Sequence, residues 1–385
     1  MKILIVSHEY PPIGGGGANA CMNLAREYVS SGHIVDIVTA WYKGESERLE
    51  NGSLTIYRLK TNRKHAEHSS FTEMLDFLLK AMPFVDGLAK SNGYDICQVF
   101  FGIPSGPVGY RLKKKYGLPY VIRFGGGDIP GFQDRFANVY KLIGPAIKLI
   151  WKNADALVAN SEGLRKMAWS FYGKKEIKII PNGAEIHNCI KEKGDCSNNK
   201  SSVNLLFVSR LIERKGLQDI IPQIGDVRNR CLEAGKDIRL QIVGDGPYRS
   251  TLEQMVATKG IGDIVTFYGQ KNKSELPQYY EDADLFIFPS RKEGMPNVVL
   301  EAMSYGLPII MTPCQGSEEL IDGNGTVTEP EDFGDRIVEL VMDSDLRLSL
   351  GRKSLQIIRD SFVWNKVADS YIFLFEEIVK TRAMY

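Results

Sequence analysis

Two glutamates eight positions apart are the residues of this chain whose placement best suits ligand binding. Glu293 and Glu301 enclose a short segment with a glycine and a proline. The apolar run 284–290 before Glu293 predicts a buried parallel strand, and Asn297 is a preferred helix N-cap ahead of an apolar-periodic stretch. We therefore expect Glu293 on the loop at the carboxyl end of a strand, and Glu301 about one turn inside the following helix.

This position predicts a site for a sugar nucleotide. Ligands of open α/β sheets bind beyond the carboxyl ends of the strands, and backbone N–H groups at a helix start attract anions. The helix start comprises Gly294, Met295, Pro296, Asn297 and Val298. All of them except Pro296 would offer a backbone N–H. The two carboxylates would accept hydrogen bonds from ligand hydroxyls. The alternative is that both glutamates only complement the helix dipole.

Two cations are expected at the carboxyl end of another strand. Arg210 and Lys215 follow the apolar run 203–208. Fixed cations beside a helix start suit a diphosphate, whereas most surface Lys and Arg side chains are simply solvated. Position favours Arg210 over its neighbour Arg214 for this role.

A glycine run follows the first predicted strand and opens a helix. Its members Gly15, Gly16 and Gly17 let the backbone approach a phosphate or a sugar closely. The run also fits the dinucleotide-binding fingerprint, which expects an acid at the end of the second strand to bind ribose. Here that strand ends Val38-Thr-Ala-Trp41, so the fingerprint is incomplete.

The chain resembles the retaining glycosyltransferases of family 4. The matching segments are, in chain order, 10–17 (YPPIGGGG), 180–183 (IPNG), 209–216 (SRL…KG), 243–247 (VGDGP) and 293–301 continued by AMSYGLP to Pro308. The resemblance runs nearly end to end. It implies the GT-B architecture, an α/β fold of two Rossmann-like doubly wound domains facing across a central cleft.

The resemblance also implies roles in transferring a sugar from a nucleoside diphosphate, UDP- or GDP-linked, to an acceptor hydroxyl with retention at the anomeric carbon. Arg210 and Lys215 would stabilise the leaving diphosphate, Glu293 would hold sugar hydroxyls, and Glu301 would accept from the ribose. Gln270, in the segment 268–271, would border the base. The glycine run would touch both the donor diphosphate and the acceptor. No metal and no cofactor is implied, because cations and backbone N–H groups neutralise the diphosphate in the resembling architecture.

One departure concerns the acceptor side. Many relatives carry a histidine shortly before an aspartate after the fifth strand, but here the segment reads Arg123-Phe-Gly-Gly-Gly-Asp128. We therefore assign no catalytic histidine. Asp128 is a candidate for orienting the acceptor, with a simple turn residue as the alternative, and His8 beside the glycine run is a second candidate acceptor contact.

Strands alternate with helices along the whole chain. We expect strands at 3–7, 34–39, 55–59, 96–100, 120–124, 156–159 and 177–180, and a second set at 203–208, 240–243, 265–268, 285–288 and 308–311. The polar, unpatterned stretch Lys191–Ser202 predicts a linker. The expected domains are 1–182 with a returning helix 365–385, which would bind the acceptor, and 183–364, which would bind the donor.

Composition favours a cytoplasmic protein. The sequence shows no signal peptide and no stretch of about 18 apolar residues that would span a membrane, and its six cysteines include no close pair of the metal-binding or redox kind. No nucleic-acid-binding pattern is present.

Charge is distributed unevenly along the chain, and its basic N-terminal half could contact an anionic membrane. Residues 1–182 hold 24 Lys and Arg against 16 Asp and Glu, a net charge of +8. The basic clusters 58–64 and 111–115, and the segment Lys141–Lys152 with its apolar residues, Trp151 and three lysines, suit peripheral contact with an anionic membrane. The alternative is that Leu142, Ile143, Ile147 and Ile150 pack under the first domain.

Two other functions compete with transfer to a glycan or lipid-linked acceptor. A sugar-nucleotide epimerase of the same architecture would need no acceptor. A non-enzymatic binding module would not need the complete set of Glu293, Glu301, Arg210 and Lys215.

Overall fold

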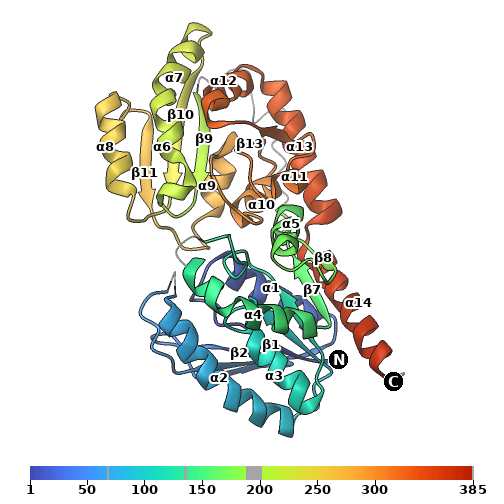
Figure 1. Ribbon diagram of the computed structural model, residues 1–385. Coiled ribbons are helices and arrows are strands. Elements are labelled where there is room, and N and C mark those ends of the chain that lie inside the picture. Colours follow the sequence, from blue (N-terminus) through green and yellow to red (C-terminus); the bar gives the residue numbers. More distant parts are fainter. Residues whose placement is uncertain (67–68, 134–136, 188–201, 384–385) are drawn as a thin grey trace. The chain divides into compact units, whose positions relative to one another are not determined.

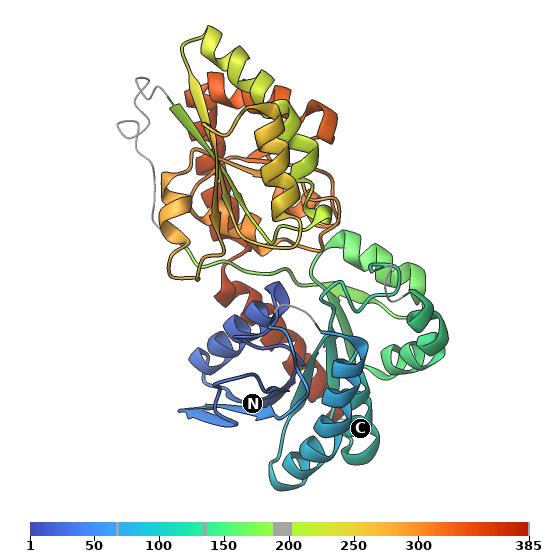
Figure 2. The same ribbon diagram turned by 90° about the vertical axis from the view of Figure 1, so that its left-hand side faces the viewer.

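The computed structural model describes residues 1–66, 69–133, 137–187 and 202–383, and the chain divides into two compact units (Figure 1). Unit 1 comprises Met1–Asn182 and Trp364–Tyr385, and unit 2 comprises Gly183–Val363. Trp364, expected in the second domain, thus falls in unit 1. The predicted linker lies outside the described residues, apart from Ser202, which opens a strand. In both units a sheet lies between two layers of helices (Figure 2).

Unit 1 is built on an eight-stranded sheet of order β3-β4-β2-β1-β5-β6-β7-β8. The strands are β1 Lys2–Val6, β2 Ile34–Ala40, β3 Arg48–Asn51, β4 Leu54–Leu59, β5 Ile96–Phe100, β6 Tyr120–Arg123, β7 Ala156–Ala159 and β8 Ile177–Ile179. The helices are α1 Gly16–Ser30, α2 Phe71–Ser91, α3 Gly106–Tyr116, α4 Ala137–Asn153, α5 Glu162–Phe171 and α14 Trp364–Ala383. Neighbouring strands run parallel except β3, which pairs antiparallel with β4.

Helices cover both faces of this sheet, and the first strand shows how. Successive side chains of a strand point to opposite faces. Leu4 and Val6 join a core that takes its helical residues from α2 to α5, whereas Ile3 and Ile5 join a core built with α1 and α14. Because both faces are buried, the central strands are continuous apolar runs rather than alternating ones, which is why they could be recognised in the sequence.

Unit 2 contains a parallel six-stranded sheet of order β11-β10-β9-β12-β13-β14. Its strands are β9 Ser202–Val208, β10 Asp237–Val243, β11 Val265–Gly269, β12 Leu285–Phe288, β13 Ile309–Met311 and β14 Gly325–Val327. Its helices are α6 Leu217–Ile220, α7 Ile224–Glu233, α8 Arg249–Lys259, α9 Pro277–Asp282, α10 Asn297–Ser304, α11 Ser317–Leu320, α12 Phe333–Met342 and α13 Ser344–Ser361, with 3₁₀ turns at Glu213–Lys215 (η2), Ile221–Gln223 (η3) and Pro330–Asp332 (η4).

The strand order of unit 2 locates its ligand crevice. Numbered within the unit, the order is 3-2-1-4-5-6, the doubly wound order of dinucleotide-binding folds. The direction of winding reverses between β9 and β12, and ligands of such sheets bind at the carboxyl ends of the strands at that point. The loops that follow β9 and β12 are therefore where a site is expected.

All the predicted strands are present, and the structure adds β3 and β14. One expectation about helices was wrong. Asn297 is not a cap: Pro296, with extended backbone angles, takes the N-cap position of α10, and Asn297 is the first helical residue. On α4 each of the two alternatives holds in part, because Leu142 is 82% exposed, whereas Ile147, Ile150 and Trp151 are buried, the last against Phe124.

Candidate functional site

In unit 2 the loops after β9 and β12 meet at one carboxylate. Oε1 of Glu293 accepts hydrogen bonds from Lys215 Nζ at 2.7 Å, Ser290 Oγ at 2.9 Å and Arg214 Nη1 at 3.2 Å. Arg214 and Lys215 close the 3₁₀ turn η2 after β9, and Ser290 and Glu293 follow β12. The predicted partners Lys215 and Glu293 are thus brought together at the reversal of strand order.

The loop after β13 fixes the backbone of Glu293. Gln315 donates its backbone N–H to the Glu293 carbonyl at 3.0 Å, and its side-chain oxygen accepts from the Glu293 N–H at 3.1 Å. Thr312 Oγ1 donates to the Ser290 carbonyl at 2.8 Å. The loops after three neighbouring strands of the sheet, β9, β12 and β13, therefore fix Glu293 through its side chain and its backbone.

The electrostatics of the cluster keep Glu293 ionised. Burial raises the pKa of its carboxyl, but the charges of Lys215 and Arg214 and the bonds from Lys215 and Ser290 outweigh burial, so the pKa lies below its usual value. The pKa of Lys215 is also lowered, mainly by burial, with the charges of Arg214 and Arg210 adding to the effect. More than one cation faces a single carboxylate, which is the arrangement expected where a further anion is to bind.

Arg210 and Arg214 take different positions around Glu293. The guanidinium that contacts Glu293 belongs to Arg214, whereas Arg210 is exposed and acts on Lys215 through its charge. The diphosphate role assigned to Arg210 stays a prediction, and the contact of Arg214 with Glu293 was not foreseen.

Glu301 lies one turn inside α10, as expected, and its surroundings are aromatic. Tyr280 donates its hydroxyl to Glu301 Oε2 at 2.9 Å. The ring of Tyr280 stacks on Tyr305, whose other neighbour is the ring of His187 at a centroid distance of 4.1 Å. Burial raises the pKa of Glu301, and the bond from Tyr280 opposes that rise. No pattern in the sequence indicated that Tyr280 binds this carboxylate.

The remaining donor-side candidates lie at the same edge of the sheet. Gly294, Met295 and Pro296 lead into α10, which begins with Asn297 and Val298, and Met295 is buried. Gln270 is exposed immediately after β11. The roles assigned to these residues stay predictions.

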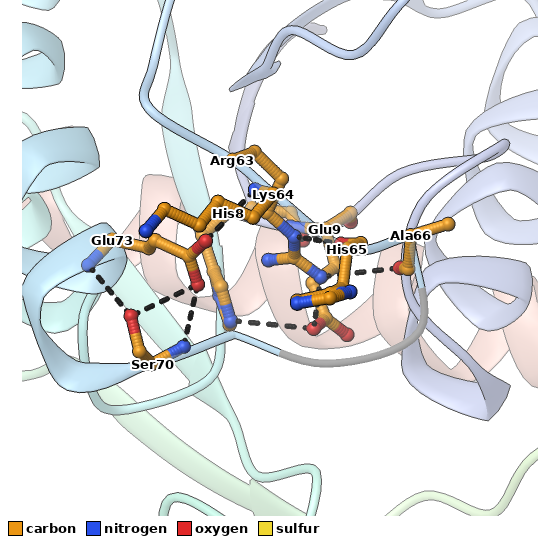
Figure 3. A network of polar contacts seen from close by, with 9 residues as sticks. His8, Glu9, Arg63, Lys64, His65, Ala66, Ser70 and Glu73 are labelled. Carbon is orange, nitrogen blue, oxygen red and sulfur yellow. Dashed lines mark hydrogen bonds and ion pairs between the residues drawn. The ribbon is translucent and has the colours of Figure 1, made fainter.

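In unit 1 the glycine run is held by a buried ion pair (Figure 3). Gly15 is the N-cap of α1, which begins at Gly16. The Gly14 N–H donates to the Ala66 carbonyl at 2.7 Å, and Arg63 Nη2 binds both that carbonyl and Glu9 Oε1 at 3.2 Å. The Arg63 side chain is only 3% exposed. The run is thus tied to the loop ahead of α2.

His8 lies beneath this network and is neutral at physiological pH. Its Nε2 is 3.7 Å from Glu9 Oε1, and its ring meets Phe101 edge-on at 4.9 Å. Burial lowers its pKa to about 4, against a smaller opposing effect of Glu9. Nδ1 is buried, and no described residue forms a hydrogen bond with it. An acceptor contact by His8 remains a prediction.

Asp128 is fixed by backbone amides. Its two carboxylate oxygens accept from the N–H groups of Gly102 at 2.6 Å and Gly125 at 2.8 Å. The side chain is buried, which raises its pKa despite these bonds. These contacts favour the alternative of a loop-shaping residue over direct contact with an acceptor.

One glycine of the segment that lacks the expected histidine, Gly125, has a packing partner. A Cβ at Gly125 would lie 2.3 Å from the ring of Phe101, and one at Gly17 would lie 2.5 Å from the same ring. Phe101 itself has a left-handed backbone, with φ of 69°. Its ring occupies the space that side chains at both glycine positions would need.

Comparison with known proteins decides the family. Residues 14–187 match the model for "Glycosyltransferase Family 4", and residues 202–343 match that for "Glycosyl transferases group 1". The chain is 26% identical over 396 residues to an uncharacterised glycosyltransferase of Methanocaldococcus jannaschii, covering 98% of each chain. The chain is a family 4 glycosyltransferase.

Solved structures agree on the fold. Sucrose-phosphate synthase from Thermosynechococcus elongatus superposes with a TM-score of 0.83 at 20% identity, over 99% of this chain and 100% of the other. Anabaena HepE, solved with UDP and glucose, gives a TM-score of 0.71 at 18% identity, over 98% and 99%. The glycosyltransferase therefore has the GT-B fold of two Rossmann-like domains.

The basic clusters of the glycosyltransferase are largely paired within unit 1. Arg111 and Lys115 both contact Asp86 at 2.7 Å, Lys113 contacts Asp155 at 2.7 Å, and Arg58 contacts Glu45 at 3.1 Å. These pairs weaken the expectation that either cluster faces an anionic surface. Helix α4 differs, because it carries Lys141, Lys148 and Lys152 and contains no acidic residue.

Metal-binding clusters and membrane-spanning helices are both absent from the described residues. Within residues 1–66, 69–133, 137–187 and 202–383, no three His, Cys, Asp or Glu side chains are grouped so as to hold a metal ion. Over the same ranges, no helix combines the length and apolar character that a membrane crossing needs.

Proposed function

We propose that this glycosyltransferase transfers a hexose from a nucleoside diphosphate sugar to an acceptor hydroxyl, with retention of anomeric configuration and without a divalent metal. The observation that carries the proposal is the cluster of Glu293, Lys215 and Arg214 at the reversal of strand order in unit 2. A buried carboxylate that already faces two cations provides both an anion-binding element and a hydrogen-bond acceptor for sugar hydroxyls.

Each residue then has a defined task. As the bond between the sugar and the diphosphate breaks, negative charge grows on the leaving oxygen, and preorganised cations stabilise that charge most effectively where water is excluded. Lys215, with a side chain 11% exposed, is the cation best placed for this, and Arg210 adds its charge. All three hydrogen bonds described for the Glu293 carboxylate fall on Oε1. Its second oxygen, Oε2, is therefore the acceptor that sugar hydroxyls would use.

Glu301 and the start of α10 would bind the rest of the donor. The carboxylate of Glu301, oriented by Tyr280, would accept from the ribose hydroxyls. Backbone amides of the segment 294–298 would face the diphosphate, and Gln270 would border the base. We expect a UDP- or GDP-linked sugar; HepE, which shares the fold, was solved with UDP and glucose.

A donor panel tests the proposal. Nucleotide sugars are screened by thermal shift, since a ligand at 100 times its dissociation constant stabilises a protein by about 2.7 kcal/mol. The donor that binds is then incubated with candidate acceptors, with and without EDTA. We expect transfer that survives chelation, and complete loss restored by manganese would refute metal independence.

Incubating the same donor without an acceptor distinguishes a transferase from an epimerase. An epimerase would convert the nucleotide sugar with no acceptor present, whereas a transferase would yield at most slow hydrolysis. Conversion to an isomeric nucleotide sugar at a rate comparable to transfer would favour the epimerase. Configuration of the transferred sugar, read from its anomeric proton coupling, tests retention.

We further propose that α4 contacts an anionic membrane when the acceptor is lipid-linked. Leu142 is 82% and Leu149 47% exposed on a helix with three lysines and no acid, a pattern typical of helices that lie in the lipid interface. Sedimentation with anionic and neutral liposomes tests this contact. Leu142→Ser with Leu149→Ser should reduce binding, whereas Leu79→Ser, at a leucine 63% exposed on α2, is the matched control. Absence of sedimentation with either liposome at low salt would refute the contact.

A further inference from the structure

Arg214 belongs to none of the motifs that carry the family resemblance, yet it is bound closely to the loop that carries Glu293. Its Nη1 donates to Glu293 Oε1 at 3.2 Å and to the Lys292 carbonyl. Its own carbonyl accepts from the Arg291 N–H at 3.0 Å and from Ser290 Oγ at 3.4 Å. Both the backbone and the guanidinium of Arg214 are therefore attached to residues 290–293.

The contact that Arg214 makes overlaps with that of Lys215. Both cations bind the same oxygen of Glu293. In the proposed reaction Lys215 binds a diphosphate. The negative charge of the diphosphate competes with Glu293 for the ammonium group of Lys215. A carboxylate held by Lys215 alone would lose much of its compensating charge at that moment. A guanidinium presents its donors in a rigid plane, and Arg214 is already anchored to the loop, so it can keep its contact while Lys215 turns to the donor.

We propose that Arg214 is a positioning residue for Glu293, which it holds in place and ionised while Lys215 engages the donor diphosphate. The inference rests on the proposed function, because it assigns Lys215 to the diphosphate. Arg214 itself need not touch the substrate.

The groups around Glu293 define what the loss of Arg214 would change. Arg214 and Lys215 approach from η2, Ser290 from the loop after β12, and Cys314 interacts electrostatically from the loop after β13. The two cations favour the ionised carboxylate and burial opposes it. Removing Arg214 takes away one of the two cations, so the pKa of Glu293 should rise. Activity that needs the ionised form is then lost at a higher pH as the solution is acidified.

The experiment compares Arg214→Ala, Arg214→Lys and Arg214→Gln with the wild type, by the dependence of kcat/KM on pH with the donor found in the panel. Arg291→Ala is the matched control. Arg291 lies in the loop that carries Glu293, but its side chain binds Asp219 at the surface. We expect Arg214→Ala to lower kcat/KM roughly ten- to a hundredfold, the worth of one hydrogen bond between charged groups. Its acid limb should also move to higher pH, and Arg214→Gln should behave in the same way if the alanine variant does not fold.

Arg214→Lys should keep the position of the acid limb and recover only part of the rate, because lysine restores the charge but not the rigid plane. Arg291→Ala should match the wild type in both measures. A uniform loss at every pH, with the acid limb unmoved, would mean that Arg214 only stabilises the loop, and would overturn the proposal.

A second readout does not depend on turnover. Carbon-13 NMR of protein labelled at glutamate carboxyls gives the pKa of Glu293, with its resonance identified by its absence in Glu293→Gln. A higher pKa in Arg214→Ala supports the proposal, and an unchanged pKa overturns it. If the wild type transferred sugar from no donor, the proposed function would fail, while this titration would still decide whether Arg214 keeps Glu293 ionised.

Discussion

Replacing Glu293 by glutamine removes one charge from the centre of the candidate site and almost nothing else. The amide has nearly the same shape as the carboxylate, and its oxygen can still accept from Ser290 and from both cations. The contacts with Lys215 and Arg214, at 2.7 and 3.2 Å, would change from charge-paired to charge–neutral. The variant therefore separates the charge of the group from its packing.

The structure sets the expected magnitudes. A hydrogen bond to a charged group contributes about 1.5–3 kcal/mol, and loss of one of the two charges in each contact weakens it by about 1 kcal/mol within that range, so the two contacts together lose about 2 kcal/mol. The share of Arg214 is at the lower end, because its side chain is 35% exposed and partly screened by solvent. For a unit of about 150–250 residues this corresponds to a fall in Tm of about 4–8 °C. Turnover should fall much further, by about 10²–10³, as for loss of one preorganised contact to the transition state.

The assay measures kcat, KM and Tm of Glu293→Gln beside those of Glu233→Gln. Glu233 is exposed at the end of α7 in the same unit, so its variant reports the effect of a lost carboxylate charge alone. A large loss of kcat with a small change in Tm, absent from the control, is the expected result. Turnover within a few-fold of the wild type would refute the assignment of Glu293.

Three further predictions concern other parts of the molecule. Glu301→Ala should raise the dissociation constant for the nucleotide more than it lowers kcat, because ribose contacts are similar in ground and transition states; calorimetry with the free nucleoside diphosphate checks this, and an unchanged constant would refute it. His8 has a pKa of about 4 in the folded state against about 6.5 when unfolded, so the stability that depends on its neutral form is fully present above pH ~6.5 and is lost as pH falls towards 4. By linkage the loss reaches about 3 kcal/mol, and His8→Phe should show a correspondingly weaker acid dependence in denaturant titrations between pH 7 and 4. Arg63→Ala should cost about 3–5 kcal/mol by leaving Glu9 without its buried partner, and Glu9→Gln with Arg63→Met should recover part of that loss; equal stability of Arg63→Ala and the wild type would contradict the role of the pair.

The fold was readable from the sequence where strands are buried on both faces. Such strands are short apolar runs bounded by polar or turn residues, as in β1 or β12, and the alternation with helices predicts a parallel sheet. The two strands that were missed lack this signal. All four residues of β3, Arg48–Asn51, are exposed, so only pairing with β4 makes them a strand. Strand β14 has three residues, none of them buried, and depends on β13 in the same way.

The helix α4 shows a different limit. Its apolar positions predicted a buried face, and Ile147 and Ile150 do pack inward. The pattern alone did not fix the rotation of the helix, so it did not separate exposed Leu142 from buried Ile147, Ile150 and Trp151. Trp151 is buried because Phe124 and Phe171 of neighbouring elements supply an aromatic pocket for it, and those partners are distant in sequence.

Arg214 rather than Arg210 lies beside Glu293, for a local reason that the sequence does not display. The Leu211 N–H binds the Asp245 carbonyl at 2.8 Å and the Leu211 carbonyl accepts from Tyr248 at 3.0 Å, so this stretch is held against the loop after β10. The chain then folds into η2 and returns to the loop after β12, where the Arg214 carbonyl meets the Arg291 N–H. Arg210 precedes that return and Arg214 completes it. Spacing along the chain identifies which cations follow a strand, but the path between the strands decides which of them reaches the carboxylate, and that path is set by backbone bonds to two other loops.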